Sequence, residues 1–121
     1  KIKLIMQVKI IKEKISFNEL KNIAGDGYGE MVKAVVDVET GIMAVGGELH
    51  ADESEELFEH GSKNENLWGV NIYLDRPKND YLEYNSLINV KPSINRSMDI
   101  QNLEVKEKIM KIVNNLIEWK I

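Results

Sequence analysis

Residues 31–49 read MVKAVVDVETGIMAVGGEL, and this stretch decides the fold. Two apolar runs flank Thr40-Gly41, a two-residue turn signal, so the pattern predicts a β-hairpin. Pairing the strands on that turn puts Val36 opposite Val45 and leaves one face of the hairpin wholly apolar.

The opposite face of the hairpin is polar toward its open end. The same register pairs Lys33 with Glu48, and opposite charges directly across two strands contribute about 0.2–1 kcal/mol. A three-residue loop from Glu39 to Gly41 would break this match, so the two-residue loop is preferred. The sequence therefore predicts a sheet with one apolar face and one open face.

Outward from the hairpin, helices are expected where a capping residue precedes apolar residues at helical spacing. Ser16 and Glu19 form a capping box, and Asp52 is a good N-cap. Strands are expected where apolar and polar residues alternate. The further strands expected are 8–15, 67–75 and 84–91, and the helices are 17–24, 52–60 and about 102–119.

The resulting order, β-α-β-β-α-β-β-α, predicts the α+β class with a mainly antiparallel sheet of about five strands. Each expected helix has a single apolar stripe, so all three helices are expected to pack on the apolar face of the sheet. The open face would then display Lys33, Asp37, Glu48, His50, Asn71, Tyr73, Asn89 and Lys91.

The chain has 121 residues, no cysteine and a formal net charge of -4. This length fits one domain, taken as residues 1–121, in which residues 1–7 are interpreted as a loose or non-native N-terminal extension. The lack of cysteine excludes a disulfide scaffold, a thiolate zinc site and thiol catalysis.

Charge and hydropathy patterning bear on partners and location. No apolar run approaches the roughly 20 residues of a membrane span, so no membrane partner is expected. The chain is mildly acidic and has no basic stripe, so no nucleic-acid partner is expected. Lysines interrupt the apolar residues near the N-terminus, which is unlike a signal peptide and favours a cytoplasmic location.

Glu48, His50 and Asp52 form the first candidate site. If the second hairpin strand continues, residues two apart project from one face, so Glu48 and His50 would lie together. A histidine beside carboxylates suits general-base catalysis, with His50 as the base and Glu48 orienting it, or a divalent metal. The alternative is structural, because Lys33 already partners Glu48 and Asp52 caps a helix. Only one other histidine exists, so no metal ligand is assigned and no cofactor is expected.

The strand end and loop around residues 92–99 form the second candidate site. Arg96 is one of only two arginines, and its planar guanidinium suits a phosphate or a carboxylate. The alternative is an ordinary polar turn whose Ser and Asn side chains bond their own backbone. The ligand-binding residues expected here and on the open face are Asn71, Tyr73, Asn89, Lys91, Ser93, Asn95, Arg96 and Ser97.

Two functions fit these features. The first is a site for a small polar or anionic ligand between the open sheet face and loop 92–99, with hydrolysis as its enzymatic version. Residues 48–59 carry six acids, which repel an anion, so if the two candidate sites adjoin, a zwitterionic or metal-bridged ligand is favoured over a bare phosphate. The second is a structural or interaction protein that forms a homodimer through the open face. The apolar residues expected on that face are Val35, Ile42, Tyr73 and Leu87.

A resemblance to a known family rests on four segments: Met31–Asp37, Gly41–Asp52, Leu67–Tyr73 and Asn95–Ser97. They resemble an uncharacterised family of small prokaryotic proteins, known as a domain of unknown function. The likeness covers nearly the whole chain, from about Val8 to Trp119, and implies a stand-alone single-domain protein. It implies no activity, substrate or catalytic residue.

Overall fold

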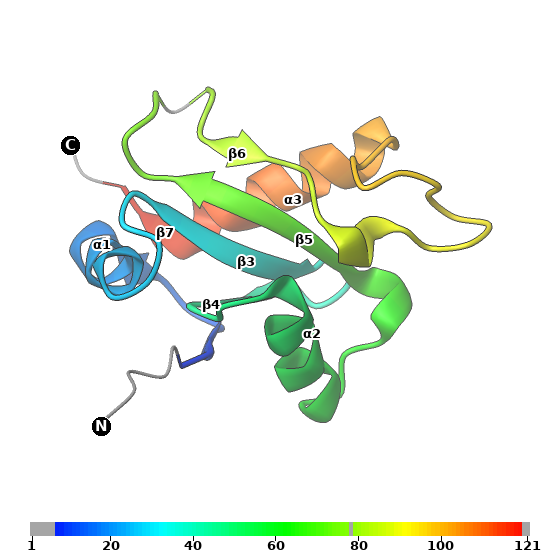
Figure 1. Ribbon diagram of the computed structural model, residues 1–121, viewed down its shortest axis with the longest axis horizontal. Helices are drawn as coiled ribbons and strands as arrows, with labels where there is room; N and C mark the ends of the chain where they lie inside the picture. The colour runs from blue at the N-terminus through cyan, green and yellow to red at the C-terminus, as the bar shows by residue number, and fades with distance from the viewer. Residues whose placement is uncertain (1–6, 78, 120–121) are drawn as a thin grey trace.

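Figure 1 shows the computed structural model of the chain, which describes residues 7–77 and 79–119. The strands are β1 (Lys9–Ile11), β2 (Ile15–Ser16), β3 (Met31–Asp37), β4 (Ile42–Val45), β5 (Leu67–Tyr73), β6 (Leu82–Glu83) and β7 (Ile117–Glu118). The main sheet has the order β1-β4-β3-β5-β6, and each neighbouring pair is antiparallel. β2 and β7 form a separate parallel pair.

Helices cover both faces of the main sheet. They are α1 (Phe17–Gly25), α2 (His50–Glu59) and α3 (Leu103–Leu116), with short 3-10 turns η1 (Asn64–Asn66) and η2 (Leu87–Asn89). α3 runs behind the sheet in Figure 1, and α2 lies on the viewer's side. The predicted α+β class and mainly antiparallel sheet are confirmed.

The expectation that all three helices pack on one face is wrong for α2. Buried residues of α1 and α3 join one core with the apolar face of the hairpin. Leu57 of α2 instead packs in a second core with Val35, Ala44 and Leu67, on the opposite face. The reason is that Val35 and Ala44 make that face apolar at its centre, and α2 removes this surface from water.

The β3–β4 hairpin is confirmed, but its register differs by two residues from the prediction. Asp37 lies opposite Ile42, so the loop has four residues, 38–41, where two were predicted. The Asp37 carboxylate accepts the backbone N–H groups of Glu39 and Thr40 at 2.9 and 3.1 Å, which stabilises the longer loop. A shift of two residues keeps each side chain on its predicted face.

β4 ends at Val45, earlier than predicted. Gly46 has a φ of 89°, in the left-handed region that favours glycine, and it turns the chain out of the sheet. The predicted pairing of Lys33 with Glu48 is therefore wrong. Lys33 lies opposite Asn71 of β5 instead.

α2 begins two residues earlier than the predicted start. Its first residue is His50, and its N-cap is Leu49 where Asp52 was predicted. The expectation that Glu48 and His50 share a strand face is consequently wrong, because His50 is helical. The helix ends before Gly61, whose φ of 103° is typical of the glycine that follows a helix.

The predicted strand 84–91 is wrong, because only the two residues of β6 pair with β5. Ser86 starts a 3-10 turn in its place, and its hydroxyl accepts the N–H of Ile88 at 3.3 Å. The Asn89 side chain then makes hydrogen bonds to β5 that a neighbouring strand would have made. Its amide pairs with the Gly69 backbone N and O at 2.8 and 3.0 Å.

The two ends of the described chain meet beside the main sheet. The predicted strand 8–15 is divided into β1 and β2, and β2 pairs with β7. The predicted cap at Ser16 is confirmed, because its hydroxyl accepts the N–H of Glu19 at 3.0 Å. Asn102 caps α3 and accepts the N–H of Glu104 at 2.8 Å. α3 gives way to β7 before its predicted end.

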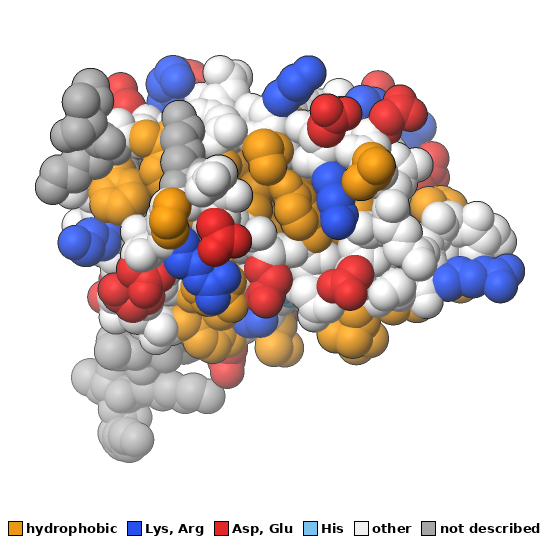
Figure 2. Space-filling model, turned by 90° about the horizontal axis from the view of Figure 1, so that it is seen from above, with side chains coloured by type: hydrophobic (Ala, Val, Ile, Leu, Met, Phe, Trp, Pro, Cys, Tyr) orange, Lys and Arg blue, Asp and Glu red, His pale blue; other side chains and the backbone are white. Residues whose placement is uncertain are grey.

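The N-terminal extension expected at residues 1–7 lies, apart from Gln7, outside the described residues. No described helix is both long enough and apolar enough to cross a membrane. Figure 2 shows the face over β6 and α3, where apolar side chains are interspersed with charged side chains of both signs.

Asp37 ties the hairpin loop to the connection between α2 and β5. Its side chain is 1% exposed, and its Oδ2 accepts the Ser62 hydroxyl at 2.6 Å. Burial acts to raise the pKa of Asp37, but the hydrogen bonds from Ser62, Thr40 and Glu39 outweigh burial and lower it. The ionised carboxylate therefore stabilises the fold.

We expect Asp37→Ala to lower the free energy of unfolding at pH 7 by about 1–3 kcal/mol, because three donors lose their acceptor. The folded-state pKa lies below the ordinary value of 3.8. This stabilisation is therefore present above that value and is lost as the pH falls through the folded-state pKa. Urea unfolding at pH 7 and at pH 3 measures both effects. Exposed Glu39→Ala is the control, with an expected change under about 0.5 kcal/mol, and equal effects of the two substitutions would contradict the prediction.

Candidate functional site

A row of polar side chains crosses the second face of the sheet beside the first turns of α2. Lys33 on β3 lies opposite Asn71 on β5, and Asn71 lies opposite Glu83 on β6. His50 and Glu53 are three residues apart in α2, so they share a helix face, and both are buried. Both are close enough to Lys33 for its charge to act on them. We call these five residues the polar cluster.

His50 is anchored to β5 by one hydrogen bond. Its Nε2 lies 2.8 Å from the Val70 carbonyl oxygen, and the side chain is 7% exposed. Burial lowers the pKa of His50 to about 4, the charge of Lys33 acts in the same direction, and hydrogen bonds with Val70 and Asn71 oppose them. The ring is therefore neutral at pH 7. Because a donor is needed at the carbonyl, Nε2 carries the proton and Nδ1 is an acceptor.

Gly69 allows His50 to approach the strand this closely. A Cβ atom at Gly69 would lie 2.7 Å from the Ser86 Oγ and 3.1 Å from the His50 Cγ. A side chain at this position would displace the ring from Val70, so the strand needs glycine here.

The Asn71 amide has a fixed orientation and an unmet acceptor. Its Nδ2 donates to Glu83 Oε1 at 2.8 Å, and the Tyr73 hydroxyl donates to the same oxygen at 3.1 Å. A carboxylate only accepts, so it selects the amide nitrogen and turns the Asn71 oxygen away. That oxygen is buried and has no hydrogen-bond partner in the structure. The Asn71 side chain lies within hydrogen-bonding reach of His50.

Glu53 is the most unusual member of the polar cluster. Its side chain is fully buried, Oε2 accepts the Gly47 N–H at 2.9 Å, and Oε1 has no partner. Burial raises the pKa of Glu53 well above its ordinary value, against the hydrogen bond from Gly47 and the charge of Lys33. Burial therefore favours the protonated carboxyl group of Glu53 over its anion. A Cβ on Gly47 would lie 2.8 Å from the Glu53 Cγ, so close packing explains this glycine.

Sequence analysis missed Glu53 and Glu83. Glu53 stood within an acidic run that is typical of a solvated helix start. A usable signal was present, because Glu53 and the core residue Leu57 are four residues apart and therefore share a helix face. Glu83 gave no signal, since only its pairing with Asn71 gives it a role.

Lys33 supplies the positive charge of the polar cluster. Its Nζ lies 5.4 Å from the centre of the Tyr28 ring. Across residues 7–77 and 79–119 the sole salt bridge joins Lys9 to Glu19, so no described carboxylate lies within 4 Å of the Lys33 ammonium. The Lys33 charge is free to meet a ligand.

The two predicted site asparagines in the 89–97 segment are structural in this fold. Asn89 is fully buried, and its amide pairs with Gly69 as described. Asn95 is 2% exposed, and its Nδ2 donates to three carbonyls, those of Asn89, Ser97 and Asp99. Neither amide lies on the surface.

The other predicted residues of this segment do not join the polar cluster. Lys91 Nζ donates to the Asn64 carbonyl at 2.9 Å and lies 4.9 Å from the Trp68 ring centre. Ser97 Oγ accepts the N–H of Asp99. Ser93, with a φ of 73°, and Arg96 belong to the segment between η2 and α3. Part of this segment forms the loop that projects at the right of Figure 1.

Glu48 and His50 have different hydrogen-bond partners. Its backbone carbonyl accepts the Tyr28 hydroxyl, and its side chain is exposed. His50 uses Val70 as its partner, so the predicted orienting role of Glu48 has no hydrogen bond to support it. The structure thus brings together His50, Asn71 and Tyr73 of the predicted residues.

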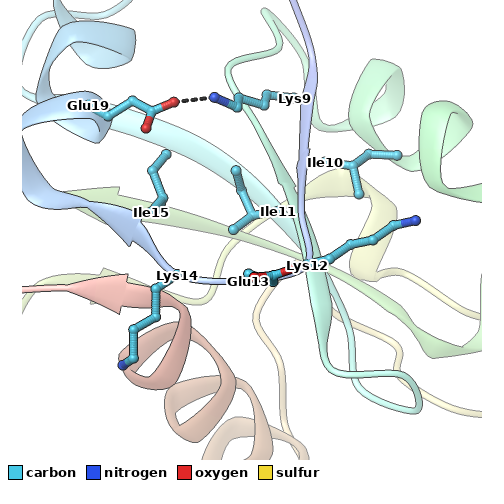
Figure 3. Close-up of a pocket in the computed structure, with 8 residues that line it drawn as sticks. All are labelled: Lys9, Ile10, Ile11, Lys12, Glu13, Lys14, Ile15 and Glu19. Atoms are coloured by element: carbon cyan, nitrogen blue, oxygen red, sulfur yellow. Dashed lines mark hydrogen bonds and ion pairs between the residues drawn. The ribbon is translucent and has the colours of Figure 1, made fainter.

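A hollow beside β1 is a separate feature of the surface (Figure 3). Three lysines border it, which suggests an anion site at first sight. However, Lys9 pairs with Glu19, Lys14 donates to the Asn115 carbonyl, and Lys12 points away from both. The charges do not converge, so the hollow is not a candidate site. It is lined by Lys9, Ile10, Ile11, Lys12, Glu13, Lys14, Ile15 and Glu19.

Within the described part of the chain, no group of three or more His, Asp or Glu side chains is placed to bind a metal ion.

Comparison with known proteins gives a family and no activity. A family model described as "Protein of unknown function" matches residues 9–116. No curated protein and no solved structure matches the chain.

We expect Glu53→Gln to stabilise the protein at pH 8 and to have little effect near pH 4.5. The unfolded carboxyl ionises above about pH 4.5, whereas burial opposes ionisation of the folded one, so wild-type stability falls as the pH rises toward the folded-state pKa. Glutamine keeps the oxygen that accepts the Gly47 N–H and does not ionise. The expected gain at pH 8 is at least about 1.4 kcal/mol, the equivalent of one pKa unit. Urea unfolding at both pH values measures it, and exposed Glu55→Gln is the control. A loss of stability at pH 8 would contradict the burial argument.

We expect the His50 ring to titrate near pH 4 in the folded protein. Between the ordinary value of 6.5 and this folded value, the unfolded chain binds more protons, so acidification through this window removes stability. Side-chain ¹⁵N NMR spectra recorded against pH give the midpoint and show which ring nitrogen is protonated. A midpoint above 6, or a proton on Nδ1 at pH 7, would contradict the assigned hydrogen bond.

Proposed function

The chain belongs to DUF5674, a family of proteins of unknown function, and we propose that it binds a small polar molecule at the polar cluster. The observation that carries this proposal is the buried Asn71 oxygen without a partner. Leaving such an acceptor unmet costs about 1–3 kcal/mol. A ligand that donates to it recovers that free energy, which gives the bound state an advantage.

A ligand bound at Asn71 would meet charges of both signs. Lys33 and Glu83 stand on either side of Asn71 along the row and carry opposite signs. Tyr73 is half-buried beside them. Surroundings of this kind favour a neutral or zwitterionic polar molecule over an ion of one sign.

The proposed site differs from the predicted one in its position. It keeps the open sheet face but replaces loop 92–99 by the β6 edge. The reason is that the amides of Asn89 and Asn95 are already used within the protein. Arg96 therefore contributes no contact in this proposal.

We propose that the polar cluster binds a ligand and does not hydrolyse it. A general base works best when its pKa is close to the working pH. The pKa of His50, about 4, makes its ring a weak base at neutral pH. The neutral ring is better suited to accept a hydrogen bond through Nδ1.

The other partners and the location stay predictions. A homodimer through the open face has less surface than expected, because Val35 is fully buried beneath α2 and Ile42 is half-buried. Nucleic acid remains unexpected on grounds of charge. The cytoplasmic location belongs to the proposal and is supported by the lack of cysteine.

We expect polar fragments that bind the wild-type protein to lose affinity by about tenfold in Asn71→Leu, because the loss of one hydrogen bond to a buried group is worth about 1.4 kcal/mol. Leucine keeps a similar volume and removes the acceptor. Asn18→Leu, at an exposed position in α1, is the matched control and should bind normally. Saturation-transfer NMR with a fragment library measures binding.

A second variant guards against misfolding of Asn71→Leu. Glu83 is exposed, so Glu83→Gln should leave the fold intact. Because glutamine can also donate, the Asn71 amide can then flip and exchange the positions of its oxygen and nitrogen. It should weaken the same fragments. The proposal fails if the library gives no binders at the polar cluster, or if Asn71→Leu and Asn18→Leu bind equally.

A further inference from the structure

Residues 84–100 double back on themselves and form an arm beside the sheet, part of which projects at the right of Figure 1. The two limbs of this arm are joined by backbone hydrogen bonds. The Ser86 N–H donates to the Met98 carbonyl at 3.0 Å, and the Lys91 N–H donates to the Asn95 carbonyl at 2.8 Å. The buried Asn95 amide adds its three bonds to carbonyls of the same arm. The conformation of the arm is therefore fixed by its own hydrogen bonds.

The arm exposes four large apolar side chains. Leu87 is 73% exposed, and Val90, Ile94 and Met98 are exposed as well. Because hydrogen bonds hold the arm in shape, these side chains are not needed for its own packing. Apolar side chains scattered singly over a surface are ordinary, whereas several gathered in one exposed segment mark an interaction surface.

α2 lies next to the arm, so Phe58 and the arm share one surface. Ile88 of the arm packs against the core that contains Leu57 of α2, and η2 contacts α2. His50 and Phe58 are eight residues apart, about two helical turns, so they lie on the same flank of α2. His50 shows that this flank faces β5 and the arm, because its ring bonds to the Val70 carbonyl. The Phe58 side chain is 55% exposed there.

The two parts of this surface carry opposite charges. Residues 87–98 contain Lys91 and Arg96 and no acid, whereas α2, residues 50–59, contains five acids and no lysine or arginine. The sole salt bridge within residues 7–77 and 79–119 lies elsewhere, at β1 and α1. Both sets of charges are therefore unpaired within the described part of one molecule.

A surface with an apolar centre and two oppositely charged halves is complementary to a second copy of itself. A two-fold axis between α2 and the arm places the arm of each copy on α2 of the other, so that each contact is made twice. Arg96 of each copy then meets the acidic helix of the other, and the apolar side chains meet between them. A partner of a single charge, such as an anionic lipid surface, would attract the arm and be repelled by α2.

We propose that the chain forms a two-fold symmetric homodimer in which the arm of each copy packs on α2 of the other. The proposed interface differs from the open sheet face, where the sequence predicted a homodimer, and it needs no ligand at the polar cluster.

Sedimentation equilibrium of the full chain at pH 7 measures the dissociation constant of this dimer. Leu87→Ser and Phe58→Ser should each raise that constant at least about tenfold, because buried apolar anchors at the centre of an interface carry much of the affinity. Both side chains are exposed in the single molecule, so urea unfolding should show little change in stability. Met110→Ser, at an exposed position on α3, is the matched control and should leave the constant unchanged.

Charge exchange tests which elements meet. Arg96→Glu and Glu55→Lys, both at exposed positions, should each weaken the dimer about tenfold, because each brings like charges together at both contacts. An equimolar mixture of the two variants should associate as tightly as the wild type. In the mixed dimer the introduced glutamate meets the introduced lysine at one contact, and the original pair meets at the other. Exposed Lys21→Glu on α1 is the control and should not weaken the dimer.

Three results would overturn the proposed dimer. The first is a wild-type chain that stays monomeric at submillimolar concentration, including one that binds vesicles of anionic lipid instead. The second is a dimer that Leu87→Ser and Phe58→Ser leave unchanged, because such a dimer uses another surface. The third is a mixture of the charge variants that associates as weakly as each variant alone, because the arm then does not pack on α2.

Discussion

The pairing of β3 with β5 is the constraint on which the rest of the structure depends. Seven residue pairs run from Met31 opposite Tyr73 to Asp37 opposite Leu67, and they form the centre of the sheet. This register sets Lys33 beside Asn71 on one face and the apolar core on the other. It also leaves Val35 in the middle of the second face, where only a covering helix can remove it from water. The position of α2, and with it that of His50 and Glu53, follows from that need.

Covering the second face buries polar groups that the first face does not contain. α2 brings a neutral histidine and a carboxyl group with a raised pKa against the sheet, beside an amide oxygen that lacks a partner. None of these groups stabilises the fold in the way that the satisfied carboxylate of Asp37 does. Buried acids and bases with unmet hydrogen bonds are typical of functional sites, where local stability is sacrificed for chemistry or recognition.

The hairpin and the helices could be predicted because local patterns encode them. The apolar alternation of β3 and the cap at Ser16 act within a few residues, and the structure confirms them. The second half of the site could not be predicted, since Glu83 acquires its role only through pairing with Asn71. The misjudged strand 84–91 has the same cause. Its alternation is correct for a strand, yet the Asn89 side chain takes the hydrogen bonds that a strand backbone would have made.

The shortness of β6 shapes the edge of the sheet at which we propose the binding site. A full-length strand beside β5 would have carried side chains across Gly69, and His50 would have had no room against Val70. With only two residues in β6, Glu83 still reaches Asn71 and fixes its amide, while the next part of the chain turns away at Ser86. Asn89 then closes the exposed edge of β5 without adding a strand. The arrangement of the polar cluster therefore depends on a strand that ends early, and its residues come from three separate strands and a helix.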